Sequence, residues 1–224
     1  MSLTVSASSG GGNFVQVPPG MHLARCYRIV DLGTQKSEYQ GKINLLPKVM
    51  FQFEVHGENE QGEPLVTDKG EPLSVSKNFT LSLGEKATLR KDLQTWRGKE
   101  FAAEELKGFQ LENVLGAWCM LSITHRIYNE KTYSNIENIN PVPQAIKKAG
   151  LPEGHNAPQI FSIRDADMDM FNSFSTYLQD KIKLSPEWAE WNGSLTGEQS
   201  FAPTSEIPQG TRDTFENMDD DIPF

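Results

Sequence analysis

The sequence predicts a mostly β protein: one sheet-built domain with a helix near its middle, then a helical extension and an acidic tail. Three observations predict this. Apolar and polar residues alternate with a period of two in five segments between residues 21 and 140. Between the third and fourth of these segments the period becomes helical. Residues 192–224 have no periodicity and are rich in Gly, Ser, Thr, Pro and acidic residues.

The first 20 residues are rich in Ser and Gly and close with QVPPG, so we expect residues 1–20 to form a flexible arm. Three strands follow, in HLARCYRIVDL from His22, in 48–55 and in 73–83. In the second strand the odd-numbered residues from Val49 to Val55 share one face, which is predicted to lie in the core. The even-numbered residues from Lys48 to Glu54 share the other face, which is predicted to be wet.

The next segment is predicted to be a short amphipathic helix over 88–96, because Leu89, Leu93 and Trp96 recur at helical spacing. A further helical turn is expected at 101–106, and strands resume at 116–127 and 132–139. Three strands, a helix and two strands is the element order of the OB-fold, a five-stranded Greek-key barrel that binds oligonucleotides on its second and third strands and in neighbouring loops. Other small barrels have similar patterns. We therefore predict an OB-fold DNA-binding domain over 21–145.

Residues 146–191 are predicted to be a loop and a helical extension. IKKAGLPEGHNAPQ is typical of a loop, and apolar residues then recur at helical spacing from Met168 to Ile182, with Asp165 or Asp167 as the N-cap. Pro186 suits the first turn of a following helical stretch that carries Trp188 and Trp191. This apolar stripe is compatible with docking on the barrel or on a second protomer. Residues 192–224 are predicted to be a disordered acidic tail with a partner-binding tip.

The net charge of -9 is concentrated at one end of the chain. Residues 1–150 hold 17 Lys and Arg against 16 Asp and Glu, net +1, and residues 151–224 hold 4 against 14, net -10. This division is typical of an ordinary body with an acidic interaction tail. No segment resembles a signal peptide or a membrane span, and Cys26 and Cys119 are interpreted as buried thiols, so a cytoplasmic location is expected.

Catalytic chemistry finds little support in the sequence. The four histidines are scattered without partners at metal-ligand spacing, and there is no phosphate-binding loop or nucleophile elbow. The aspartates at 165, 167 and 169 are better explained by the favourable charge of a helix start than by a divalent-ion site. We expect no enzyme activity, no metal and no cofactor.

A surface that holds single-stranded DNA without reading its sequence needs cations for the phosphates and flat side chains for the bases. The candidates come from the faces opposite the predicted core and from the first loop: Arg25, Tyr27, Lys36, Tyr39, Lys42, Lys48, Gln52, Lys77, Trp118, Arg126, Tyr128 and Tyr133. Tyr27 and Trp118 are also compatible with a place in the core under the helix. Lys77 interrupts an apolar face, which indicates a bulge or a rim.

The last six residues carry a resemblance to a known family. Asp219, Asp220, Asp221, Ile222, Pro223 and Phe224 resemble the C-terminal tip of bacterial single-stranded DNA-binding proteins, which also follows a disordered linker. LARCYRIVDLGTQ and YSNIENINPVP, within residues 20–145, resemble OB-fold single-stranded DNA-binding proteins of bacteriophages. The linker here is short, and the helical stretch has no counterpart in the bacterial proteins.

The resemblance implies a protein that coats and protects single-stranded DNA during phage replication and recombination. It implies that the tip recruits host or phage replication, recombination and repair proteins. From its net charge of -10, we expect the acidic tail to compete with DNA for the cationic cleft. An alternative is a recombination mediator or strand-annealing protein whose helix at 165–191 assembles protomers on DNA. A small enzyme or inhibitor built on the same barrel is a third class, which the lack of a catalytic cluster disfavours. The oligomeric state stays open.

Overall fold

The computed structural model of the chain describes residues 15–39, 42–128 and 131–196. The strands are β1 (Gly20–Tyr39), β2 (Lys42–His56), β3 (Ser74–Thr80), β4 (Trp118–Tyr128), β5 (Lys131–Asn140) and β6 (Gln159–Phe161). The α-helices are α1 (Thr88–Arg97), α2 (Ala103–Lys107), α3 (Gln144–Ala149), α4 (Met168–Ser173), α5 (Thr176–Lys183) and α6 (Pro186–Thr196). Two 3-10 helices, Leu111–Val114 and Ile163–Asp165, precede β4 and α4. The prediction of a mostly β protein with helices after the third and fifth strands is confirmed.

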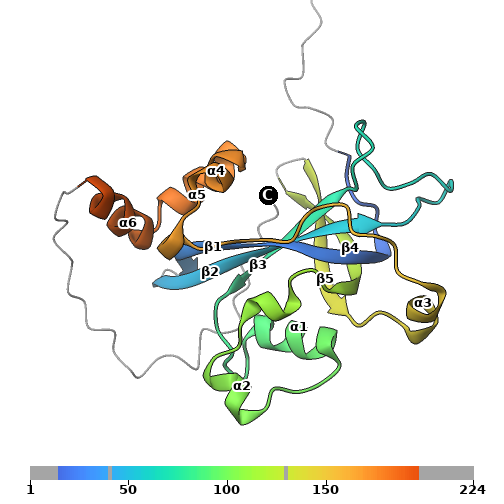
Figure 1. The fold of residues 1–224 in the computed structure, drawn as a ribbon, viewed down its shortest axis with the longest axis horizontal. Helices are drawn as coiled ribbons and strands as arrows, with labels where there is room; N and C mark the ends of the chain where they lie inside the picture. The colour runs from blue at the N-terminus through green and yellow to red at the C-terminus, as the bar shows by residue number, and fades with distance from the viewer. Residues whose placement is uncertain (1–14, 40–41, 129–130, 197–224) are drawn as a thin grey trace, which may run out of the picture.

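The strands form one sheet in the order β3-β2-β1-β4-β5, with antiparallel neighbours, and β6 adds to β1 in parallel (Figure 1). The first part of β1, from Gly20 to Arg25, pairs with β4, and the part from Arg28 to Val30 pairs with β6. The two ends of the order also meet, because Lys77 Nζ on β3 donates a hydrogen bond of 3.2 Å to the carbonyl oxygen of Glu137 on β5. The sheet is therefore strongly curled.

The β1–β2 hairpin is longer than predicted. Its pairing runs from Leu23 opposite His56 to Tyr39 opposite Lys42, with register shifts after Cys26 and after Asp31. The first loop predicted around Lys36, Tyr39 and Lys42 is therefore wrong, since these residues belong to β1 and β2. The physical reason is support from the extension, which contacts this part of the hairpin and allows the pairing to continue beyond the curled sheet.

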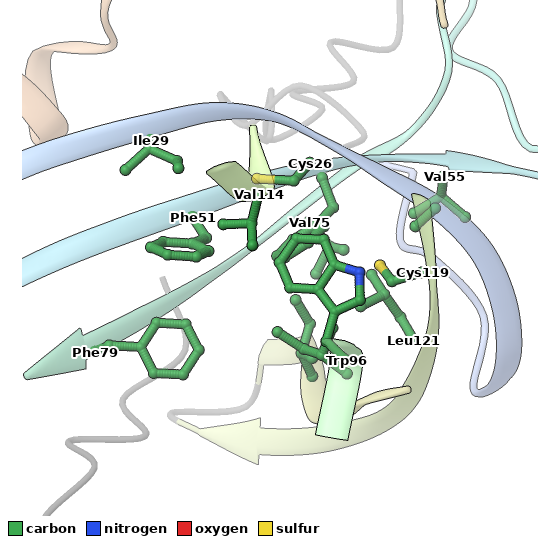
Figure 2. Close-up of a cluster of buried hydrophobic side chains, with 14 of the residues drawn as sticks. Cys26, Ile29, Phe51, Val55, Val75, Phe79, Trp96, Val114, Cys119 and Leu121 are labelled. Carbon is green, nitrogen blue, oxygen red and sulfur yellow. The ribbon is translucent and has the colours of Figure 1, made fainter. Parts of the chain in front are cut away.

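The main core lies inside the curled sheet and is closed by α1. Figure 2 shows Phe51, Phe79 and Trp96 among these buried side chains, which come from β2, β3 and α1. Phe51 and Phe53 are 1% and 0% exposed, as predicted for the odd-numbered face of β2. Cys26 and Cys119 are free buried thiols, which confirms that interpretation.

A second core lies on the opposite face of β1 and β2. The extension supplies most of it, and its members are Val30, Leu32, Met50, Phe161, Ile163, Phe171, Phe174, Leu178, Ile182 and Trp188. Figure 1 shows α4, α5 and α6 gathered at the end of the β1–β2 hairpin where the two strands connect. The prediction of a wet face on β2 is wrong, because Lys48 and Met50 are 6% and 7% exposed and Glu54 is 0% exposed. Of the two docking alternatives, the structure has the apolar stripe on the chain's own sheet.

The helix predicted from Met168 to Ile182 is two helices in the structure. Asp167 caps α4, since its Oδ1 accepts hydrogen bonds from the backbone of Asp169 and Met170 at 2.9 and 3.0 Å. The chain is extended at Phe174 and Ser175, and the Ser175 hydroxyl then caps α5. The two helices place Phe171, Phe174 and Leu178 in the second core. Pro186 begins α6, as predicted.

The described end of the N-terminal arm packs against the sheet. Val17 is 2% exposed and belongs to the main core, and its carbonyl oxygen lies 2.8 Å from Nε2 of His125 and accepts a 2.7 Å hydrogen bond from the Ser134 hydroxyl. Across the described ranges, no helix is both long and apolar enough for a membrane span.

Candidate nucleic-acid interface

The outer face of β1 and β2, where four of the twelve candidates were predicted, carries a buried group of polar residues. We call Arg25, Glu54, His56, His155 and Asn156 the Glu54 cluster. Arg25 Nη1 and His56 Nε2 each lie 3.3 Å from Glu54 Oε1. The backbone amides of His155 and Asn156 donate to the Glu54 carboxylate at 3.0 and 2.7 Å, and the Asn156 side chain adds a third bond of 2.7 Å. The cluster therefore ties residues 155 and 156 to the sheet.

Glu54 is ionised within this cluster. Burial acts to raise the pKa of the Glu54 carboxyl, but the hydrogen bonds from Asn156, His56 and His155 outweigh it, and the pKa is lowered from its ordinary value. The carboxylate thus neutralises the guanidinium of Arg25, whose side chain is only 14% exposed. Arg25 also donates to the carbonyl oxygens of Gly116 and Asn156 at 3.2 and 3.0 Å. This arginine is a structural residue in the described conformation, with little charge to offer a phosphate.

Residues 150–158, which we call the strap, cross this face between α3 and β6. The contact is close at Gly154, where an added Cβ would lie 1.9 Å from Nη1 of Arg25. A second close approach occurs at Gly33 of β1, which has φ of +64° and where an added Cβ would lie 2.5 Å from Cβ of Ser185. Both glycines let the extension lie directly on β1.

The neighbouring candidates on this face are also engaged with the extension or buried. Arg28, which is not among the residues predicted from the sequence, donates to Gln159 Oε1 at 2.9 and 2.7 Å and to Gln52 Oε1 at 3.3 Å. Tyr27 falls at the register shift after Cys26 and is 7% exposed, in agreement with its alternative place in the interior. Lys48 is buried at 6% exposure.

Trp118 and Lys77 have structural surroundings. The ring of Trp118 is half-buried and meets the ring of His56 edge-on at 4.8 Å, beside the Glu54 cluster. Lys77 is 9% exposed, and its ammonium lies 3.0 Å from Asp92 Oδ2 of α1. Because Lys77 also donates to the carbonyl oxygen of Glu137, it joins β3, α1 and β5. Its side chain therefore lies in the interior of the curled sheet.

The remaining candidates lie toward the two hairpin ends. Lys36 is exposed on β1. Arg126 and Tyr133 are direct cross-strand partners on β4 and β5, with Arg126 exposed and Tyr133 half-buried. Arg126 also pairs with Glu137 at 3.3 Å between side chains that are 42% and 40% exposed. Tyr39, Lys42 and Tyr128 end their strands at these hairpins, and their side chains, like the tip at 219–224, lie outside the described residues.

The structure therefore divides the candidates instead of joining them in one patch. Arg25 is bonded to the extension through Asn156, and Gln52 and Trp118 contact Arg28 and His56 beside it. Lys36, Arg126 and Tyr133 lie toward the hairpin ends. Sequence reasoning missed Glu54 as the centre of the buried cluster, because a carboxylate that alternates with Phe53 and Val55 is typical of a strand with one wet face. The contacts of His155 and Asn156 had no local signal.

The described ranges contain no group of three or more His, Cys, Asp or Glu residues placed to hold a metal ion. No protein-family model matches the chain, and the search of curated proteins also found no match.

Proposed function

We propose that this protein binds single-stranded DNA without reading its sequence, and that it coats and protects the strand during DNA replication and recombination. It acts without catalysis. The acidic C-terminal tip recruits replication, recombination or repair proteins of a phage or its host. This role takes place in the cytoplasm of the bacterial host, by a protein of bacteriophage origin.

The strand order carries this proposal. The order β3-β2-β1-β4-β5, the meeting of β3 with β5 and the position of α1 between β3 and β4 in the chain support a partly open OB barrel. Fold alone does not determine function, so the terminal DDDIPF sequence is the second support. Its Phe224 side chain suits a small apolar pocket, and the aspartates suit a basic rim on a partner.

The surface for DNA in this proposal is the pair of hairpin ends, since the outer face between them is covered. Lys36 lies on one hairpin and Arg126 with Tyr133 on the other. Cations on both sides meet the phosphates, and the tyrosine ring offers a face to a base. Arg126 keeps an exposed ion pair with Glu137, which contributes little and is readily exchanged for a phosphate.

The test is binding of a fluorescent oligo-dT, followed by anisotropy at low and at high salt, with a duplex of equal length as the control. We expect binding at micromolar protein or below that weakens steeply with salt, because phosphate contacts release counterions. Absence of salt-dependent binding to oligo-dT would reject the proposal.

Deletion of residues 217–224 tests the role of the tip. We expect DNA affinity to be equal or higher, because an anionic competitor is removed, and capture of replication proteins from a host extract to be lost. A lower DNA affinity after the deletion contradicts the competition.

The alternative of a strand-annealing or recombination mediator needs a different assembly surface from the one first expected. The apolar stripe of the extension is buried in the chain's own second core, with Ile182 at 0% and Trp188 at 8% exposure. A strand-annealing assay, with particle size measured in the presence of DNA, separates the two functions.

A further inference from the structure

The end of the β1–β2 hairpin forms a platform whose two faces differ. We call residues 33–39 and 42–48 the distal ribbon, which is paired from Gly33 opposite Lys48 to Tyr39 opposite Lys42. The face that carries Gln35 is held by the extension, since Gln35 Nε2 donates to the carbonyl oxygen of Lys181 at 3.0 Å. At the free edge of β1 the amide and the hydroxyl of Thr34 donate to the Glu187 carboxylate at 2.8 and 2.5 Å. An isolated two-stranded hairpin is marginally stable, so these contacts fix the ribbon in place.

The opposite face of the distal ribbon is apolar and open. β2 has no extra residue along its pairing with β1, so its odd-numbered side chains continue the face that forms the main core. Beyond the core, Ile43 and Leu45 on this face are 56% and 63% exposed. Leu81, 45% exposed, adjoins them, since its amide donates to the carbonyl oxygen of Pro47 at 2.8 Å. We call Ile43, Leu45, Pro47 and Leu81 the apolar strip.

Positive charge accompanies the apolar strip. Lys36 is exposed and directly opposite Leu45 in the ribbon, so the two side chains share a face. The guanidinium of Arg90 reaches the carbonyl oxygen of Leu83 at 3.2 Å, two residues beyond Leu81. The distal ribbon holds three lysines and one glutamate, whereas the loop at 57–73 at the other end of β2 holds five acids and one lysine.

We propose that the apolar strip is the base-contacting surface for single-stranded DNA, with Lys36 on an adjacent phosphate; this rests on the proposed function. Unpaired bases present flat apolar faces, which Leu and Ile side chains contact in other nucleic-acid complexes. A strand of alternating bases and phosphates matches an apolar strip edged by cations. A second copy of the chain fits less well, because it would bring two net-positive ribbons together. The acidic loop at 57–73 excludes the strand from the far end of β2.

The test compares the full-length Ile43→Ser/Leu45→Ser variant with the Leu184→Ser variant. Leu184 is 79% exposed after α5, so its replacement removes a similar apolar side chain from another surface. We expect the double variant to bind oligo-dT about tenfold more weakly with an unchanged salt slope, because no charge is lost. Leu184→Ser should bind as the wild type does. A third variant, Lys36→Gln, should reduce the salt slope by about one.

Thermal unfolding of each variant checks that the exposed replacements leave the fold intact. If the wild type binds oligo-dT and the double variant binds it with equal affinity, this assignment is overturned and the proposed function stands. A wild type that does not bind oligo-dT overturns both. If affinity is unchanged and the double variant sediments as a monomer where the wild type is a dimer, the apolar strip is a contact between copies, which also overturns the assignment.

Discussion

The two faces of β2 are buried by different means. From Val49 to Val55 its odd-numbered face is covered by neighbouring strands and α1, in a core made almost wholly of apolar side chains. Its even-numbered face is covered by a segment more than 100 residues later in the chain, through the second core at one end and the Glu54 cluster at the other. The first face needs only hydrophobic burial, whereas the second also needs complementary hydrogen bonds.

The extension is therefore part of the fold, and we expect it to detach from the sheet at a lower free energy than the strands of the sheet detach from one another. The second core is smaller than the main core. Backbone hydrogen bonds between strands join β1 to β2 and β4, and β4 to β5, over long stretches. The extension shares such bonds with the sheet through the short strand β6. Elements with fewer buried contacts open at lower free energy than the centre of a domain. Three predictions, from the largest expected effect to the smallest, sharpen this comparison.

Phenylalanine truncation in each core should have the largest effect. Phe53→Ala is expected to lower the free energy of unfolding by about 3–5 kcal/mol and to weaken the whole chain. Phe174→Ala removes a similar ring from the second core and should mainly release the extension. Urea unfolding followed by tryptophan fluorescence gives the loss, and hydrogen exchange locates it. Equal loss of protection in β4 and β5 for both variants would contradict the separability of the extension.

Replacement of Glu54 by Gln should have an intermediate effect, about 2 kcal/mol, because an amide cannot accept all the hydrogen bonds that the carboxylate accepts. The lowered pKa of Glu54 in the folded protein means that the unfolded chain binds the proton more readily. Its contribution to stability is therefore present above the unfolded pKa of about 4.3 and is lost as pH falls through the folded pKa.

The measurement for Glu54 is urea unfolding at several pH values from neutral down to acid. Wild type should lose stability at acid pH more steeply than Glu54→Gln, which has no proton to bind at this position. Exchange of the 155 and 156 amides should rise in the same range. If stability falls with pH in parallel for the two proteins, protonation of Glu54 is not the cause of the loss of stability at acid pH.

Gly154→Ala should have the smallest effect, about 1 kcal/mol, at the low end of overpacking costs, because the added Cβ meets the end of the Arg25 side chain. Gly108→Ala is the control, since an added Cβ there has no neighbour within 4 Å. The same unfolding assay, with exchange of the strap amides, checks this. A neutral Gly154→Ala would mean that Arg25 moves aside without weakening the strap.

The parts of the fold that follow from local pattern could be predicted from the sequence. Alternation in β2 and β4 and the spacing of Leu89, Leu93 and Trp96 gave the core faces and the position of α1. The length of the hairpin and the register shift at Tyr27 could not be predicted, because both depend on contacts with neighbouring strands and with the extension. The break at Ser175 was concealed by an apolar spacing that suits one helix or two.

The candidate site was harder to predict for an electrostatic reason. Lys48, Gln52 and Glu54 are polar at period two, which is typical of a strand with one wet face. Burial of such residues requires partners, and those of Glu54 come from His155 and Asn156, about 100 positions away. Exposure of Lys36 and Arg126 was foreseeable because both lie near hairpin ends.

The position of β1 early in the chain also has a consequence during synthesis. Arg28 and its partner Gln159 are 131 positions apart, so β1 leaves the ribosome long before the segment that covers it. At ordinary rates of synthesis this delay is on the order of ten seconds. Throughout that interval Val30, Leu32 and Met50 have no cover from the extension. Nascent chains therefore expose an apolar patch that chaperones are suited to cover until the final helices have been synthesised.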